Sequence, residues 1–220
     1  MKQLALDIAA PAAPSLDNFI AGRNAEAIVA LYALANGANT ESFIYLWGAS
    51  GCGRTHLLRA VGTAARSNDL PVQWFHARRD EHAQTRGVIW IADDVHRLTS
   101  DDQIALFNLH NRVRADGGWL LTAGDNAPSR LSLRADLVTR LASGLVYHLN
   151  GLNDDEKAAA LARHADARGI RLSREVAEYL LRHARRDLPS LLAMLDALDR
   201  YSLETKRAIT VPLVRELIAP

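Results

Sequence analysis

Eight residues, Gly48 to Thr55, have the types and spacing of a loop that binds phosphate. They read Gly-Ala-Ser-Gly-Cys-Gly-Arg-Thr, which fits the pattern G-x-x-x-x-G-K-[ST] except that Arg54 stands in place of lysine. In such a loop, backbone N–H groups and the N-terminus of the following helix face the same anion. Arg54 keeps the positive charge, but its forked guanidinium is not equivalent to an ammonium beside the β- and γ-phosphates. The loop therefore predicts nucleotide binding more strongly than hydrolysis, and a glycine turn that merely joins a strand to a helix is the alternative.

Two carboxylates, Asp93 and Asp94, follow the apolar run Val88 to Ala92 and predict a Mg²⁺ site. Asp93 is expected to hold the ion, directly or through water, together with the Thr55 hydroxyl, and Asp94 to orient or deprotonate the attacking water. The pair alone could equally cap the next turn. Its position 45 residues after Gly48, with one extra strand between, is the one that a P-loop NTPase of the additional-strand type requires. The usual residue at the place of Asp94 is the longer Glu.

The elements that must position these residues are strands and helices in alternation. Continuous apolar runs are typical of strands covered on both faces, and alternation with helices implies right-handed crossovers and a mostly parallel sheet. The predicted strands are 43–47, 72–76, 88–92, 119–123 and 145–149, and the predicted helices are 24–36, 54–66, 100–114 and 133–142, the third opened by a capping box at Ser100.

After Gly151 the strand patterns stop and only helices are predicted. Their starts are marked by Asn153 with Glu156, by Ser173, by Asp187 and by Thr210, and the first three helices are expected to end near 168, 185 and 203. The fold class is therefore α/β, a parallel-sheet P-loop domain followed by a small all-helical domain. We expect a mobile arm at 1–14, the α/β domain at 15–150 and the helical domain at 151–220.

Composition excludes several classes of protein. The 220 residues carry a formal charge of +1, which argues against a protein that coats polyanions or anionic lipid. The single cysteine, Cys52, excludes an internal disulfide and a cysteine-based zinc site. No apolar run approaches the ~20 residues that span a bilayer, and residues 1–8 lack a long apolar signal region, so a cytoplasmic protein without a membrane partner is expected.

These motifs resemble the DnaA branch of the AAA+ ATPases, and within it the Hda family of DnaA-homologous regulators of replication initiation. The resemblance extends over residues 15–218 and includes Asp17-Asn18-Phe19-Ile20-Ala21-Gly22, the run from Gly53 to Leu58, and Thr139-Arg140-Leu141. Full initiators continue into a helix-turn-helix domain and carry a helical insertion before the Asp-Asp strand. Here the sequence ends at Pro220 and only residues 77–87 occupy the place of the insertion, which disfavours a DNA-binding initiator.

The resemblance implies roles for further residues. An arm of the type Q-x-x-L-x-[apolar] docks on the β sliding clamp in this family, and the matching residues are Gln3, Leu4, Leu6 and Ile8. Arg140 is similar to the arginine finger that reaches the nucleotide of a neighbouring subunit, although a surface arginine is the alternative. Asp125 matches the position called sensor one, near the γ-phosphate, and could equally be a turn residue. The residues expected to contact ADP or ATP are Ile20, Gly48, Gly51, Cys52, Gly53, Arg54, Thr55, His56 and Asp125.

The departures from the family concern hydrolysis. Pro189 stands at the place of the sensor-two arginine, and with Arg54 and Asp94 it predicts poor turnover by the chain itself. We therefore expect a negative regulator that docks on the sliding clamp and promotes hydrolysis of ATP bound to a DnaA-type initiator through Arg140, reaching DNA only through the clamp. An autonomous AAA+ ATPase or loader-type factor, and an adaptor that needs no nucleotide, are the alternatives. Homo-oligomerisation is left open.

Overall fold

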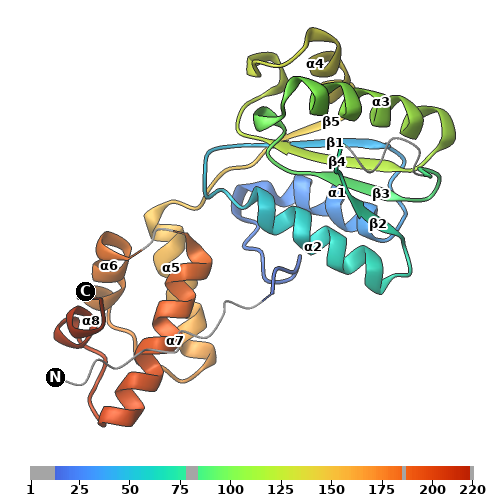
Figure 1. Cartoon of the computed structure of the whole chain (residues 1–220). Coiled ribbons are helices and arrows are strands. Elements are labelled where there is room, and N and C mark those ends of the chain that lie inside the picture. The colour runs from blue at the N-terminus through green and yellow to red at the C-terminus, as the bar shows by residue number, and fades with distance from the viewer. Residues whose placement is uncertain (1–12, 78–83, 185–186, 219–220) are drawn as a thin grey trace. The chain divides into compact units, whose positions relative to one another are not determined.

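A computed structural model describes residues 13–77, 84–184 and 187–218 (Figure 1). The chain divides into two compact units, with the boundary between Gly151 and Leu152. The predicted clamp-binding residues Gln3, Leu4, Leu6 and Ile8 lie outside the described residues.

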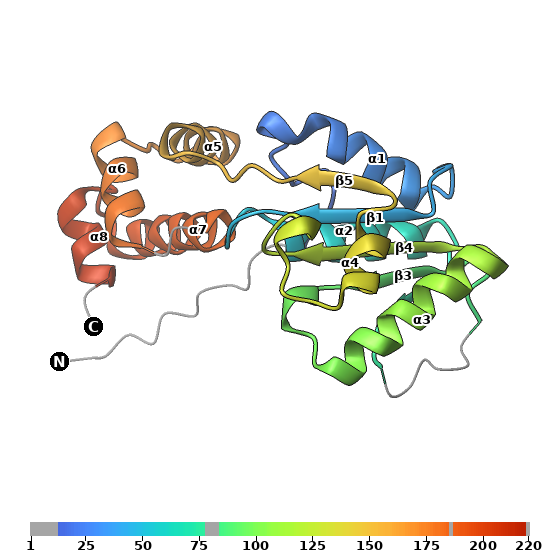
Figure 2. The ribbon, with the colours of Figure 1, turned by 90° about the horizontal axis from the view of Figure 1, so that it is seen from above.

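The first unit is built on a parallel sheet of five strands in the order β2-β3-β4-β1-β5 (Figure 1). Figure 2 shows β3, β4, β1 and β5 side by side in this order. The figures show α1 and α2 on one face of the sheet and α3 and α4 on the other. The elements are α1 (Ala25–Ala35), β1 (Phe43–Trp47), α2 (Arg54–Ser67), β2 (Val72–Trp74), β3 (Ile89–Ala92), α3 (Ser100–Asp116), β4 (Trp119–Gly124), α4 (Ala135–Leu141) and β5 (Leu145–His148), with 3₁₀ turns η1 (Gly22–Asn24), η2 (Val95–Arg97) and η3 (Pro128–Arg130). The predicted α/β fold is confirmed.

Both faces of the sheet are buried, as the continuous apolar runs predict. On β1, Ile44 and Leu46 join the core beneath α1 and α2, whereas Tyr45 joins the core beneath α3 and α4. All four residues of β3 are buried. Burial of alternate side chains on opposite faces fixes the register, because a shift by one residue would exchange the two cores.

A buried polar side chain ties the start of α1 to the end of β5. Asn24 Nδ2 donates to the carbonyl oxygen of Asn150 at 2.9 Å, and the backbone N–H of Asn150 donates to Asn24 Oδ1 at 2.8 Å. The two bonds satisfy an amide that is only 4% exposed, so leaving either partner unpaired would be costly. They hold the segment before α1, which includes Phe19, beside the end of the sheet where the strands finish.

A predicted helix cap and a predicted strand end differ from the structure. α3 begins at Ser100 as predicted, but its capping box is formed by Thr99 and Asp102 and not by Ser100 and Gln103. The β2 strand ends at Trp74, two residues earlier than predicted, although the backbone N–H of Phe75 still donates to the carbonyl oxygen of Ile91 at 2.8 Å.

The second unit consists of helices in its described residues. These are α5 (Asp154–Ala167), α6 (Arg174–His183), α7 (Leu188–Thr205) and α8 (Val211–Ile218), packed around a core that includes Leu161, Leu180, Leu195 and Val214. Asn153 with Glu156, Ser173 and Asp187 cap the first three, as predicted. Across the described part of the chain, no helix is long and apolar enough to cross a bilayer.

Candidate functional site

The predicted phosphate loop connects β1 to α2 and is packed too closely for side chains at two of its glycines. A Cβ at Gly48 would lie 2.5 Å from the carbonyl oxygen of Leu149 and 2.9 Å from Cys52 Sγ. Gly53 has a φ of +103°, and a Cβ there would lie 2.6 Å from Phe19 Cε2. The loop is therefore held between the end of β5 and the segment before α1, with its N–H groups at the start of α2.

The two predicted metal ligands meet. The Thr55 hydroxyl donates to Asp93 Oδ2 at 2.6 Å, and Asp93 Oδ1 accepts a hydrogen bond from the backbone N–H of Asp94 at 2.8 Å. Thr55 is on the first turn of α2 and Asp93 directly follows β3, so the sheet brings together residues 38 positions apart. A hydroxyl and a carboxylate are hard oxygen ligands, and Mg²⁺ takes few such protein ligands because it keeps waters and phosphate oxygens. The residues present therefore fit a magnesium nucleotide.

Arg54 lies inside the site. Its side chain is 12% exposed, its Nη2 is 3.9 Å from Asp94 Oδ1, and its Nη1 is buried without a hydrogen-bond partner among the described residues. A buried guanidinium N–H with no acceptor is a free donor for an anion such as a phosphate oxygen. Arg54 therefore offers a buried donor beside the loop, but it shares its charge with a carboxylate.

Asp94 has a left-handed backbone, with φ 47° and ψ 43°, at the start of η2. This conformation is uncommon for a residue other than glycine, and aspartate is one of the residues that adopt it most readily. The turn leaves the Asp94 carboxylate 43% exposed, where it also lies 3.7 Å from Nη1 of the exposed Arg97. Asp94 thus lies beside Arg54 of the loop.

The remaining predicted nucleotide contacts surround the loop. His56 Nε2 lies 3.0 Å from the carbonyl oxygen of Ser15, and its ring centroid is 5.6 Å from that of Phe19, the neighbour of the half-buried Ile20. Cys52 is buried, and burial raises the pKa of its thiol. Gly51 is exposed at the turn of the loop.

Sequence reasoning missed His96, which lies between two carboxylates. Its Nδ1 is 3.8 Å from Oδ1 of Asp125 and 4.0 Å from Oδ1 of Asp94. Asp125 follows β4 and Asp94 follows β3, and these strands are neighbours in the sheet. The only signal in the sequence is that His96 follows Asp94 by two residues, which does not by itself reveal the contact with Asp125.

Arg140 is not part of this cluster. It lies in the last turn of α4, with its guanidinium carbon 5.6 Å from the centre of the Phe107 ring on α3, beside His110, whose ring stacks on Phe43 at 3.8 Å. Phe43 begins β1 and Gly48 follows its end, and a strand of this length spans about 13 Å. The structure therefore places Arg140 near the other end of the strand from the loop.

His110 supplies a pH-dependent test of this packing. Burial, aided by the nearby Arg140 and Arg114, lowers its pKa from 6.5 to about 4. Below about pH 6.5 the unfolded chain binds a proton that the folded chain refuses until pH 4, so the free energy of unfolding falls as pH decreases through this window, by at most about 1.4 kcal/mol per pH unit. The free energy of unfolding, measured with urea at pH 7, 6 and 5, should change less with pH in His110→Phe than in the wild type. Phenylalanine keeps an aromatic ring that can stack on Phe43 but cannot bind a proton. An equal slope in both proteins would contradict the prediction.

Pro189 lies in the first turn of α7, whose N-cap Asp187 accepts a hydrogen bond from the backbone N–H of Ser190 at 2.9 Å. A proline at this place costs no helical hydrogen bond. The position therefore stabilises the helix start but presents no cation to a phosphate.

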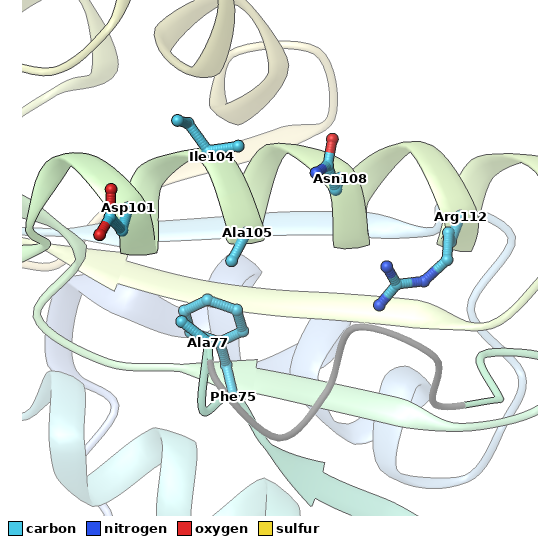
Figure 3. A pocket seen from close by; sticks show the side chains of 7 residues that line it. All are labelled: Phe75, Ala77, Asp101, Ile104, Ala105, Asn108 and Arg112. Carbon is cyan, nitrogen blue, oxygen red and sulfur yellow. The ribbon is translucent and has the colours of Figure 1, made fainter.

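A separate hollow of about 210 Å³ lies between α3 and the segment after β2 (Figure 3). Figure 3 shows the ring of Phe75 below Ala105, with Asp101 and Arg112 toward the two ends of the helix. None of the predicted site residues lines it.

Known proteins match the chain in both of its units. Residues 154–218 match the family described as "Hda, lid domain", and residues 13–86 match "Bacterial DnaA ATPAse domain". A Haemophilus influenzae protein described as "Uncharacterized protein" is 34% identical over 231 residues, which cover 99% of this chain and 98% of that one.

Solved structures show the same fold. Domain III of the replication initiation protein DnaA from Thermotoga maritima matches with a TM-score of 0.75 at 21% identity, over 96% of this chain and 100% of that one. AMPPCP-bound DnaA from Aquifex aeolicus matches with a TM-score of 0.67 at 21% identity, over 90% of this chain and 71% of that one. A RuvB variant from Thermotoga maritima matches with a TM-score of 0.66 at 17% identity, over 92% and 71%.

Proposed function

Because this chain belongs to the Hda family of DnaA-like AAA+ proteins, we propose that it regulates replication initiation by inactivating a DnaA-type initiator. In this proposal, the arm residues Gln3, Leu4, Leu6 and Ile8 dock on the β sliding clamp. The docked chain then presents Arg140 to the ATP held by the initiator and promotes its hydrolysis. The chain meets DNA through the clamp.

The observation that supports this proposal is the separation of Arg140 from the chain's own phosphate loop. The two lie at opposite ends of β1, so Arg140 is poorly placed to act on a nucleotide bound in the same chain and is suited to one held by a partner. A guanidinium supplied to a neighbouring nucleotide neutralises charge that develops in the transition state. The guanidinium of Arg140 lies over the ring of Phe107 on α3, from which it would extend to reach a partner's nucleotide.

The chain's own loop would serve regulation rather than turnover. Arg54 and the N–H groups of the loop would hold the phosphates of ADP or ATP, and Thr55 with Asp93 would hold Mg²⁺, which supplies charge neutralisation between phosphate oxygens. A solved DnaA fold relative is described as bound to AMPPCP, an ATP analogue. The Arg54 guanidinium lies 3.9 Å from the Asp94 carboxylate, so each offsets part of the charge that the other would present to a phosphate or to an attacking water.

A second function is favoured by the contact between Thr55 and Asp93, which is an arrangement that hydrolysis also needs. In that case the chain is an autonomous AAA+ ATPase or a loader-type factor. Turnover of ATP by the isolated protein distinguishes the two functions, with Asp94→Asn as the control. Robust turnover that depends on Asp94 supports the ATPase, and its absence supports the regulator.

The proposal is tested by reconstitution. Initiator loaded with labelled ATP is mixed with this chain, with and without clamp loaded on DNA, and conversion to ADP is measured. We expect conversion to need both components and to be lost when Gln3 and Leu6 are replaced by alanine, since the two side chains are the predicted polar and apolar anchors. Lys2→Ala, in the same arm but outside the motif, is the matched control. Conversion that is equally fast without clamp, or with the double variant, would overturn the docking mechanism.

A further inference from the structure

Two carboxylates from different strand ends face one imidazole in the candidate site. His96, in η2, has Nδ1 3.8 Å from Asp125 Oδ1 and 4.0 Å from Asp94 Oδ1. The two carboxylates belong to the turns after β3 and β4, so their separation is set by adjacent strands whose pairing runs from Ile89 with Trp119 to Ala92 with Thr122. A single side chain, His96, therefore lies within 4.0 Å of both carboxylates.

The two facing atoms, His96 Nδ1 and Asp125 Oδ1, are buried polar atoms that lack hydrogen-bond partners among the described residues. Both atoms have almost no accessible surface. Their separation exceeds the usual N–H to oxygen donor–acceptor range by roughly half an ångström to an ångström. A small rotation of either side chain would convert the contact into a charge-assisted hydrogen bond, which is what buried polar atoms normally form.

The turn that carries Asp125 is itself anchored. The hydroxyl of the buried Tyr45 donates to the carbonyl oxygen of Asn126 at 2.7 Å, and Gly124 lies so close to that hydroxyl that a Cβ there would clash with it. Asp125 is thus held between two fixed residues, and His96 is the neighbour that can set the direction of its carboxylate.

The cluster is also continuous with the phosphate loop. Asp94 lies between His96, at 4.0 Å, and the buried Arg54, at 3.9 Å. Asp94 and Asp125 thus both face His96, and a bound phosphate would add further negative charge to the same region. An N–H donor on His96 lessens the repulsion between these carboxylates and a bound phosphate. This effect matters more for a triphosphate than for a diphosphate, because the γ-phosphate carries additional negative charge.

We propose that His96 is a positioning residue that holds the carboxylates of Asp94 and Asp125 apart from the γ-phosphate and so allows the site to accept a triphosphate. This inference rests on the proposed binding of a nucleotide at the Gly48–Thr55 loop. His96 donates through Nδ1 to the Asp125 carboxylate, and without this donor the negative charge of the carboxylate is not offset and repels the γ-phosphate more strongly. Diphosphate binding does not depend on the contact.

The test measures affinity of the full chain for Mg-ADP and for Mg-AMPPCP by calorimetric titration. In His96→Phe we expect AMPPCP to bind about tenfold more weakly, the effect of losing one hydrogen bond to a charged group, and ADP to bind within twofold of the wild type. His96→Asn should restore AMPPCP binding, since its amide nitrogen takes the place of Nδ1. Arg97→Ala is the matched control, because Arg97 also lies beside Asp94 but its side chain is exposed to solvent.

The possible outcomes of the titrations distinguish the role of His96 from support of the fold and from the existence of the nucleotide site. Equal affinities of wild type and His96→Phe for both nucleotides would overturn the role of His96. An equal loss for ADP and AMPPCP, or a failure of His96→Asn to restore AMPPCP binding, would show that His96 only supports the fold. If the folded wild type binds neither nucleotide, the proposed nucleotide site itself is wrong, and the inference falls with it.

Discussion

Replacing Arg140 with alanine should return hydrolysis of initiator-bound ATP to the rate measured without this chain. An arginine supplied to a neighbouring nucleotide accelerates hydrolysis by a factor of roughly 10³ to 10⁵. The hydrolysis rate stimulated by this chain should therefore fall by more than about a hundredfold when Arg140 is replaced. The fold should survive, because Arg140 is half-buried at the end of α4 and its contact with Phe107 contributes only about 0.5 to 1 kcal/mol. Conversion of labelled ATP in the reconstituted clamp assay measures the effect.

Two controls separate this role from loss of charge or of structure. Arg130→Ala removes an exposed arginine from η3, in the same unit, and should leave the stimulated rate unchanged. Arg140→Lys keeps the charge without the planar fork and should restore only part of the activity. The binding of clamp and of Mg-ADP by Arg140→Ala should equal that of the wild type, since neither proposed site includes Arg140. Undiminished hydrolysis with Arg140→Ala would show that the catalytic group lies elsewhere.

Most of the fold follows from local patterns. The apolar run Phe43–Trp47 is a strand over those residues, and the capping residues Asn153, Ser173 and Asp187 begin helices as predicted. Such signals depend on neighbours in the sequence, so no knowledge of the tertiary fold is needed to recognise them.

The capping box of α3 shows where local signals become ambiguous. The run Thr-Ser-Asp-Asp-Gln offers two overlapping capping boxes, one from Thr99 to Asp102 and one from Ser100 to Gln103. The structure uses the first, because the Gln103 side chain donates to the carbonyl oxygen of Leu98 and accepts from the backbone N–H of Arg134. The contact with Arg134 is tertiary, and it cannot be read from the capping pattern.

In the candidate site, too, some contacts follow from local sequence motifs and others depend on the tertiary fold. The contact between Thr55 and Asp93 could be predicted, because each residue belongs to a motif whose place relative to a strand is known. The contact of His96 with Asp125 could not, because it depends on β3 and β4 being neighbours in the sheet. Sequence patterns identify strands, but the order of strands follows from packing of the whole unit.

Gly48→Ala should abolish binding of Mg-ADP and lower the free energy of unfolding by about 1 to 3 kcal/mol, as overpacking of a close contact does. The added Cβ would lie 2.5 Å from the carbonyl oxygen of Leu149. That carbonyl cannot easily yield, because the backbone N–H of Leu149 donates to the carbonyl oxygen of Trp47 at 2.7 Å, which fixes the chain against the end of β1. The loop must therefore move, and its N–H groups lose the geometry that a phosphate requires.

Gly117→Ala is the matched control for Gly48→Ala, because it introduces backbone strain without crowding. Gly117 has a φ of +92° after the end of α3, and a Cβ there would meet nothing within 4 Å. It should cost about 1 to 2 kcal/mol of stability, similar to Gly48→Ala, while leaving Mg-ADP binding intact. Urea unfolding with and without Mg-ADP measures both quantities for both variants. If Gly48→Ala is stabilised by Mg-ADP as much as Gly117→Ala is, then the close approach of the loop to Leu149 is not needed to hold the phosphates.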